Sequence, residues 1–253
     1  MRLVDGPGLS EPMAENSMQA VILAGGLGTR MRPITETIPK PMISVAGKPF
    51  LQHQLELLSR AGIERALLLV AYLGQQIQEY FGDGAKFGCK VSYSFEASPL
   101  GTGGALKNAK RQLQDRFVLV NGDTYLAIDY RALVKQLAEV NCSALIVAYE
   151  KPATISREIP ASILPNNLGV SPNGLVSAYR KRNPEGLSHI DAGVIVLKKE
   201  ILAGLRTGQK CSLEEEIYPS LIERGEMRAW VTREPFYDMG SPAGLAALEE
   251  KLR

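Results

Sequence analysis

Short apolar runs alternate with amphipathic stretches along most of this chain, and no other feature constrains its fold as strongly. From Gln19 the alternation runs through residues 20–24, 50–60, 66–71, 75–81 and 90–95. The short runs are rich in Val, Ile and Leu, as strands covered on both faces are, and the longer stretches have helical spacing. This rhythm predicts βαβ units in an α/β fold, with an open, mostly parallel, Rossmann-like sheet sandwiched by helices.

The same rhythm continues to about residue 150 and then loosens. Residues 117–120 and 144–148 read as strands, and residues 130–139 read as a helix. Five prolines between residues 152 and 184 then predict loops and short strands, at 176–179, 190–197 and 227–232. A helix with an acidic first turn is expected over residues 212–224, and Ser241 with Pro242 should cap and start a last helix over residues 243–252.

The 253 residues are enough for one large α/β domain, which we expect to span residues 19–253. Residues 1–18 contain acids and Gly/Pro breaks where a signal peptide would have a basic start and an apolar run. We therefore predict a disordered tail there. A role for this tail and a remnant preceding a later natural start both stay open.

Composition excludes several classes of protein. Hydrophobic residues make up 45% and charged residues 22%, and 29 basic residues nearly balance 27 acidic ones, so no strong field for nucleic acid is expected. The longest apolar run, residues 66–73, is far shorter than the roughly 20 residues of a membrane-spanning helix. The three cysteines show no metal or disulfide spacing. We predict a cytoplasmic protein with no membrane or nucleic-acid partner.

A glycine-rich turn directly after the first predicted strand is the strongest local motif. Three of its four positions 25–28 are glycine, which lets backbone N–H groups approach a phosphate chain, and Arg30 closes it with a positive charge. A turn that merely connects strand and helix remains the alternative.

Two common nucleotide motifs do not fit this turn. A dinucleotide fingerprint built on Gly26 and Gly28 would need a third glycine where Met31 stands, and an acid about 20 residues later is missing. A Walker A loop would need Gly-Lys followed by Ser or Thr, which is absent here. Any phosphate site at this turn is therefore of another type.

Lys40 lies between two prolines, Pro39 and Pro41, which restrict the backbone on both sides. Taken alone, it could be an ordinary solvated loop lysine. Together with the glycine turn ten residues earlier, it is better explained as a positioned cation for phosphate.

Two aspartates follow predicted apolar segments. Asp123 comes three residues after the apolar run 117–120, where open α/β sheets bind their ligands, and Asp238 follows Phe236 and Tyr237 just before the last helix. Two carboxylates together with phosphate oxygens and water make a typical Mg²⁺ site. Taken singly, each aspartate could equally form a turn or cap a helix.

Together these motifs resemble the sugar-1-phosphate nucleotidylyltransferases, from about Gln19 to Leu252. Segments at residues 47–50, 80–84 and 99–104 look most like the D-glycero-D-manno-heptose 1-phosphate guanylyltransferases, with GDP-mannose pyrophosphorylases close behind. The resemblance implies the nucleotide-diphospho-sugar transferase fold. It also implies transfer of GMP from GTP to heptose 1-phosphate or mannose 1-phosphate with release of pyrophosphate, as in the synthesis of capsule or lipopolysaccharide.

The resemblance also implies a role for each matching residue. Arg30 would bind the departing pyrophosphate, Lys40 would neutralise the α-phosphate, and Lys181 would grip the sugar phosphate. Asp123 and Asp238 would hold Mg²⁺. The residues implied to bind the nucleotide are Leu23, Ala24, Gly25, Gly26, Gly28, Thr29, Pro99, Gly101, Thr102 and Gly122. Among them, the loop at residues 101–104 would present its backbone groups to the base.

On the sugar side this chain departs from the family pattern. Arg180 stands where the family usually has Glu, and Asp191, followed by Gly193, stands where Asn is common. These three residues are the implied sugar contacts. A UDP- or dTDP-sugar pyrophosphorylase and a noncatalytic sugar-nucleotide sensor remain alternatives, and a homo-oligomer is left open.

Overall fold

In a computed structural model of this protein, the described residues are 18–140, 142–152, 164–181, 183 and 185–253. The predicted tail over residues 1–18 lies outside them, apart from Met18, which packs against the core. Within the described ranges, no helix is both long and apolar enough to cross a membrane.

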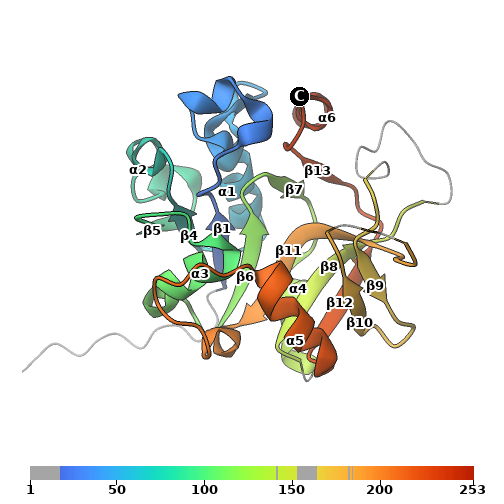
Figure 1. The fold of residues 1–253 in the computed structure, drawn as a ribbon. Helices are drawn as coiled ribbons and strands as arrows, with labels where there is room; N and C mark the ends of the chain where they lie inside the picture. The colour runs from blue at the N-terminus through green and yellow to red at the C-terminus, as the bar shows by residue number, and fades with distance from the viewer. Residues whose placement is uncertain (1–17, 141, 153–163, 182, 184) are drawn as a thin grey trace, which may run out of the picture.

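A seven-stranded sheet forms the centre of the molecule (Figure 1). Its spatial order is β12-β8-β11-β6-β1-β4-β5, and every neighbouring pair is parallel except the two that β11 makes. The strands are β1 (Gln19–Leu23), β4 (Arg65–Val70), β5 (Lys90–Phe95), β6 (Arg116–Asn121), β8 (Ala144–Tyr149), β11 (Ile190–Lys198) and β12 (Met227–Thr232). The prediction of an open, mostly parallel sheet is confirmed.

Helices cover both faces of this sheet, as the apolar strands require. On one face, Ala20 and Ile22 of β1 belong to a core with α1 (Phe50–Arg60), α2 (Gly74–Phe81) and α4 (Tyr130–Glu139). On the other face, Val21 packs in a second core with α3 (Gly101–Asn108) and α5 (Tyr218–Glu223). Because side chains alternate along a strand, β1 contributes to both cores.

A small two-stranded ribbon and the last helix pack beside the main sheet and position Asp238. β13 (Phe236–Asp238) pairs antiparallel with β7 (Thr124–Leu126). A third apolar core, which includes Tyr237 and Leu248, packs α6 (Pro242–Leu252) against this ribbon and against β2 (Ser44–Val45), which pairs with β3 (Lys48–Pro49). The Ser241 side chain accepts the Gly244 N–H at 3.1 Å, so the predicted cap of the last helix is confirmed.

A separate two-stranded ribbon is formed by β9 (Leu168–Val170) and β10 (Val176–Tyr179). It leads directly to residues 180 and 181 of the predicted sugar site. The strands expected at 176–179, 190–197 and 227–232 are all present.

The helix expected over residues 212–224 is present, as a π turn over Leu213–Ile217 followed directly by α5. One local prediction was wrong. Residues 101–104, expected as a loop, form the first turn of α3. The glycines there allow α3 to pack closely on another segment, as described below.

Candidate active site

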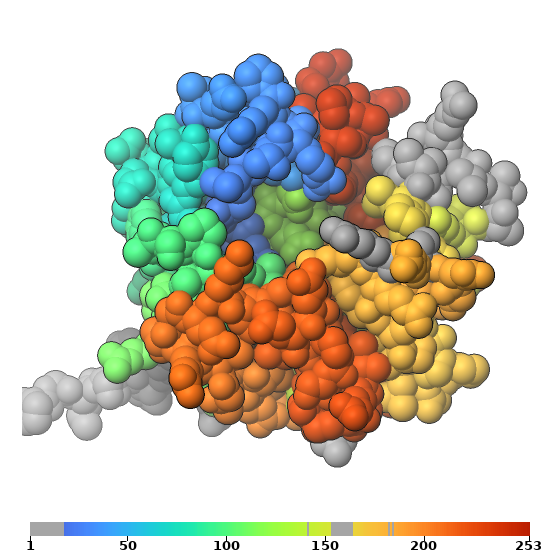
Figure 2. Space-filling model, viewed as in Figure 1, coloured from blue at the N-terminus to red at the C-terminus, as the bar shows by residue number. Residues whose placement is uncertain are grey.

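A cavity of about 380 Å³, here called the glycine-turn cavity, lies at the carboxyl ends of β1, β4 and β6. Figure 2 shows the molecule hollowed here, between the N-terminal part in blue and the orange segment near residues 200–220. Its walls include many of the residues expected to bind nucleotide and phosphate: Leu23, Ala24, Gly25, Gly26, Lys40, Pro99, Gly101, Thr102, Gly122 and Asp123.

The glycine turn joins β1 to a 3-10 turn over Thr29–Met31. Gly26 has open space where a Cβ would stand, which fits a backbone that a ligand approaches closely. Gly28 has a φ of +61°, and an added Cβ would lie 2.8 Å from Thr35 Cγ2. Gly28 and Thr29 therefore shape the turn, whereas Gly25 and Gly26 line the cavity.

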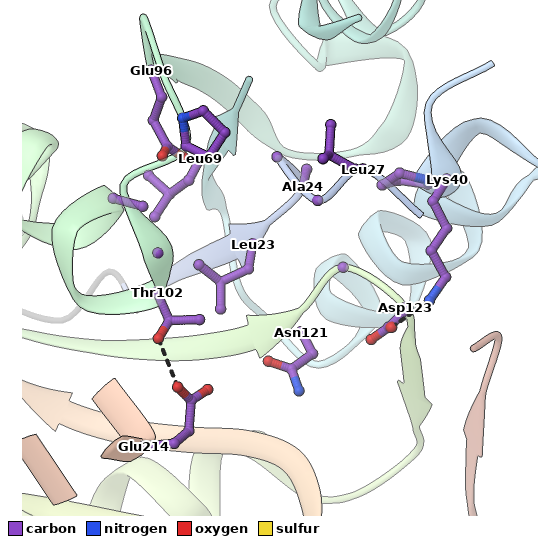
Figure 3. Close-up of a pocket in the computed structure, with 17 residues that line it drawn as sticks. Leu23, Ala24, Leu27, Lys40, Leu69, Glu96, Thr102, Asn121, Asp123 and Glu214 are labelled. Carbon is purple, nitrogen blue, oxygen red and sulfur yellow. Dashed lines mark hydrogen bonds and ion pairs between the residues drawn. The ribbon is translucent and has the colours of Figure 1, made fainter. Parts of the chain in front are cut away.

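Lys40 is held as its flanking prolines predict. Pro39 is extended, Lys40 begins a short 3-10 turn, and Pro41 is buried. The Lys40 side chain is only 12% exposed, and its Nζ lies 2.5 Å from Asp123 Oδ2. A positioned cation thus stands at one end of the cavity, opposite Glu96 (Figure 3).

Asp123 and Asp238 meet although they are far apart in the chain. Asp238 pairs with Thr124 across the β7–β13 ribbon, and the Met239 N–H donates to the Asp123 carbonyl at 2.9 Å. Burial and then the Asp123 charge raise the pKa of Asp238, against the lowering effects of the Gly240 N–H, Lys40 and Arg30. Both aspartates line a second cavity, here called the two-aspartate cavity.

This carboxylate pair fits a divalent cation. Burial is the main cause of the raised pKa of Asp238, and the Asp123 charge adds to it, so a cation bound between the two carboxylates would offset that second contribution. In the part of the chain that the structure describes, no group of three or more His, Cys, Asp or Glu side chains could hold a metal. Such a cation would therefore take its remaining oxygen ligands from phosphate groups and water, as Mg²⁺ commonly does.

Arg30 lines the two-aspartate cavity and not the glycine-turn cavity. Arg30 and Asp238 are neighbours at Gly240. A Cβ added to Gly240 would lie 2.6 Å from Arg30 Nη2 and 2.8 Å from Asp238 Oδ1. The guanidinium is therefore directed toward Asp238. Binding of departing pyrophosphate by Arg30 stays a prediction.

Lys181 and Asp191, both expected to bind the sugar phosphate or the sugar, line the same cavity. Asp191 accepts hydrogen bonds from Tyr179 Oη at 3.1 Å and from the Gly193 N–H at 2.9 Å. Burial raises the pKa of Asp191 to about 6, although these bonds oppose the shift. A half-buried, hydrogen-bonded carboxyl of this kind can orient sugar hydroxyls.

The other two predicted sugar contacts are placed differently. Gly193 lines the two-aspartate cavity with a φ of +72°, and an added Cβ would lie 2.5 Å from Thr124 Oγ1. Arg180 is exposed, lines neither the glycine-turn cavity nor the two-aspartate cavity, and its Nη1 donates to the Glu185 carbonyl at 3.5 Å. As placed, Arg180 does not face the sugar side.

The role expected for the glycines at 101–104 needs correction. We expected their backbone groups to face a base, but the Gly103 and Gly104 N–H groups donate to the Cys211 carbonyl at 2.9 and 3.1 Å. A Cβ on Gly101 would lie 2.6 Å from that carbonyl oxygen. The glycines let α3 pack against the segment at Cys211, while Gly101 and Thr102 still line the cavity.

Two carboxylates of the cavity wall were missed by sequence analysis. Glu96 directly follows β5, and the strand-end argument that identified Asp123 also applies to it. Glu214 was seen only as part of the acidic first turn of a helix. Its side chain is 14% exposed, accepts the Thr102 hydroxyl at 2.8 Å, and lies 3.5 Å from Lys181 Nζ.

Comparisons with known proteins agree with this geometry. A family model described as "Nucleotidyl transferase" matches residues 19–155. The D-glycero-alpha-D-manno-heptose 1-phosphate guanylyltransferase of Campylobacter jejuni is 33% identical over 89% of this chain and 96% of its own. The UTP–glucose-1-phosphate uridylyltransferase of Synechocystis is also 33% identical, over 82% of this chain, which spans only 56% of that longer protein.

A solved structure shows the same likeness in three dimensions. HddC from Yersinia pseudotuberculosis, complexed with GMP-PN, matches with a TM-score of 0.78 at 30% identity, covering 93% of this chain and 100% of that one. This chain belongs to the nucleotidyl transferase family and has the nucleotide-diphospho-sugar transferase fold.

Proposed function

We propose that residues 19–253 form one domain that transfers GMP from GTP to a sugar 1-phosphate and releases pyrophosphate. The single observation that carries this proposal is the convergence of Lys40, Asp123, Asp238 and Lys181 around two cavities that share Asp123. A nucleotide in one cavity and a sugar phosphate in the other would meet at these charges.

In the proposed reaction an oxygen of the sugar phosphate attacks the α-phosphorus of the nucleotide. A new P–O bond forms there, the bond to the β-phosphate bridging oxygen breaks, and pyrophosphate leaves with that electron pair. A phosphate monoester with a second pKa of about 6 is mostly dianionic at neutral pH, so no general base is required. His53 is placed for a structural role and not as a general base, because it is buried in a helix and its Nε2 lies 2.7 Å from the Val45 carbonyl oxygen.

Catalysis then rests on alignment and charge. Lys40 would stabilise the charge that develops at the α-phosphate, and Lys181 would bind the sugar phosphate. Gly25 and Gly26 would allow the phosphate chain to lie against the backbone. Bound at Asp123 and Asp238, Mg²⁺ would supply charge neutralisation and bring the two phosphates together.

Glu96 supports GTP as the donor. Its Oε2 accepts the Leu100 N–H at 2.9 Å, and among the described residues Oε1 has no hydrogen-bond donor. Guanine presents adjacent N–H donors that a carboxylate can accept, whereas uracil and thymine present one N–H between two carbonyls that a carboxylate repels. The guanylyltransferase named among the relatives also supports this choice.

For the acceptor we propose a manno-configured sugar, D-glycero-D-manno-heptose 1-phosphate first and mannose 1-phosphate second. The Campylobacter relative supports the heptose. Asp191 would supply the hydroxyl contact. The GDP-sugar formed would serve polysaccharide synthesis such as that of capsule or lipopolysaccharide. The free thiols of Cys89, Cys142 and Cys211 support a reducing, cytoplasmic location.

Two other functions keep the same fold. A UDP- or dTDP-sugar pyrophosphorylase would use the same phosphate chemistry with another base, and the Synechocystis relative is a uridylyltransferase by name. A noncatalytic sensor would be expected to have lost some of the charged groups. Arg30, Lys40, Asp123 and Asp238 are all present and converge, which favours the enzyme.

The test is pyrophosphate release with each of four nucleoside triphosphates and a panel of sugar 1-phosphates. We expect GTP to give the highest kcat/KM, with heptose 1-phosphate at or above mannose 1-phosphate, and we expect Glu96→Gln to narrow the preference for GTP. If UTP or dTTP exceeds GTP with every sugar, the guanylyl assignment is wrong. Absence of turnover in all combinations refutes the enzyme.

A further inference from the structure

Glu214 lies between the binding cavities and is assigned no role so far. Its side chain lines the glycine-turn cavity, and it also lines an outer cavity with Tyr179, Lys181, Glu215 and Pro219. Lys181 in turn lines both the outer cavity and the two-aspartate cavity. The Lys181–Glu214 ion pair therefore joins the places where we propose that the two substrates bind.

The carboxylate of Glu214 is held in its ionised form. Its Oε2 accepts hydrogen bonds from the hydroxyls of Thr102 and Ser212, each at 2.8 Å, and lies 3.5 Å from Lys181 Nζ. Burial alone would raise the pKa of Glu214, but these contacts and a backbone N–H outweigh it and lower that pKa. A fixed negative charge thus faces the Lys181 ammonium. Figure 3 shows the Glu214 carboxylate directed at Thr102 across the lower part of the cavity.

The backbone that carries Glu214 is also fixed. The Cys211 carbonyl accepts two N–H groups of α3, the Cys211 N–H donates to the Leu100 carbonyl at 2.8 Å, and the Leu213 N–H donates to Thr102 Oγ1 at 2.8 Å. The π turn that starts at Leu213 places Glu214 directly beside α3. Glu214 is therefore a stable reference point on the nucleotide side.

Lys181 differs from Glu214 because its side chain is 49% exposed. A free lysine side chain has many rotamers, and ordering it when a phosphate binds costs conformational entropy. An anchored carboxylate at 3.5 Å reduces that cost in advance. The remaining N–H groups of the ammonium stay available to a phosphate in the two-aspartate cavity.

We infer that Glu214 is a positioning residue, which holds the Lys181 ammonium ready for the phosphate of the sugar 1-phosphate. This inference rests on the proposed function and deepens it, because it names a determinant of acceptor binding. Glu214 acts through Lys181 and does not itself touch the reacting phosphates.

Glu215 provides a matched control. Its Oε1 also lies near Lys181 Nζ, at 4.0 Å, but its side chain is 70% exposed. An exposed ion pair at this distance contributes little free energy toward fixing the position of the lysine side chain. Glu215→Gln removes the same charge from the neighbouring position without removing the buried anchor.

The experiment measures kcat and both KM values for Glu214→Gln and Glu215→Gln. Gln can still accept the Thr102 hydroxyl but presents no negative charge to Lys181, so the fold should persist, which a melting curve checks. We expect Glu214→Gln to raise KM for the sugar 1-phosphate roughly five- to tenfold, with kcat and KM for GTP changed less than about twofold. Glu215→Gln should leave all three within about twofold.

A double-mutant cycle with Lys181→Met separates positioning from a general structural effect. In the Lys181→Met background, Glu214→Gln should change KM for the sugar 1-phosphate by less than about twofold. An unchanged KM in the single variant, an equal loss in the Lys181→Met background, or a rise confined to KM for GTP would each overturn the inference. An unaltered protein that is inactive with every substrate pair would instead refute the proposed function.

Discussion

Lys40 Nζ and Asp123 Oδ2 are separated by 2.5 Å and by 83 positions in the chain. The pair stands where the two main cavities adjoin, because Asp123 lines both of them. A lysine fixed between two prolines thus compensates one of two neighbouring aspartates. Under the proposed function, this arrangement would bring a cation for phosphate and a carboxylate pair for a metal to one point.

Replacing Lys40 tests the cation. Lys40→Ala is expected to lower kcat roughly a hundredfold while the Kd for GTP changes less than about threefold, since the ammonium matters most as charge develops in the transition state. Steady-state kinetics and equilibrium titration measure the two effects separately. Weaker GTP binding with an unchanged kcat would contradict the role assigned to Lys40.

Replacing either aspartate tests the metal site. Asp123→Asn and Asp238→Asn should each reduce kcat at least about a hundredfold at saturating Mg²⁺, with the melting temperature preserved. Asp129→Asn is the control, because Asp129 caps α4 through the Ala132 N–H at 3.0 Å and lies outside the site. Near-normal turnover in an aspartate variant would remove that residue from the metal site.

Gly240 is expected to tolerate no side chain. A Cβ there would lie 2.6 Å from Arg30 Nη2 and within 2.9 Å of both Asp238 carboxylate oxygens. Gly240→Ala should therefore displace both groups and lower kcat/KM about tenfold or more. Gly204→Ala is the control, because nothing lies within 4 Å of its added Cβ. Equal activity of the two variants would show that the site accommodates the methyl group.

Asp191 predicts a pH dependence of stability. Burial raises its pKa to about 6 from 3.8, so the folded protein binds this proton more tightly than the unfolded chain. Its contribution to stability is fully present below about pH 4 and is lost as pH rises through about 6. Asp191→Asn lacks this titration. The free energy of unfolding in urea, taken as unaltered protein minus variant, should fall over that window, and a constant difference would rule out the shift.

The sheet was predictable from sequence because its strands are buried on both faces, which leaves continuous apolar runs such as residues 66–70. The insertion of β11 between β6 and β8, antiparallel to both, was not predictable. Strand order depends on which distant segments pair, and the residues of β11 have the same apolar character in either direction.

The site residues likewise fall into those that local sequence signals mark and those that only the folded structure brings together. Lys40 and the two aspartates were found because local signals, flanking prolines and strand ends, mark them. Glu214 carries no such local signal, because its role depends on Thr102 and Lys181, which approach it only in the folded chain. The glycines at 101–104 are the opposite case. Their motif was recognised in the sequence, but the reason for the glycines is close packing against Cys211, a contact that only the folded chain makes.

The central claim, that a sugar-phosphate oxygen attacks the α-phosphorus of the nucleotide, is tested most directly by isotope tracing. The protein is incubated with GTP, Mg²⁺ and a sugar 1-phosphate labelled with ¹⁸O in its phosphate oxygens, and the products are analysed by mass spectrometry. Attack by the sugar-phosphate oxygen should give a GDP-sugar that retains all of the label and pyrophosphate that contains none. Label in the pyrophosphate, or no GDP-sugar with any sugar 1-phosphate offered, would contradict it.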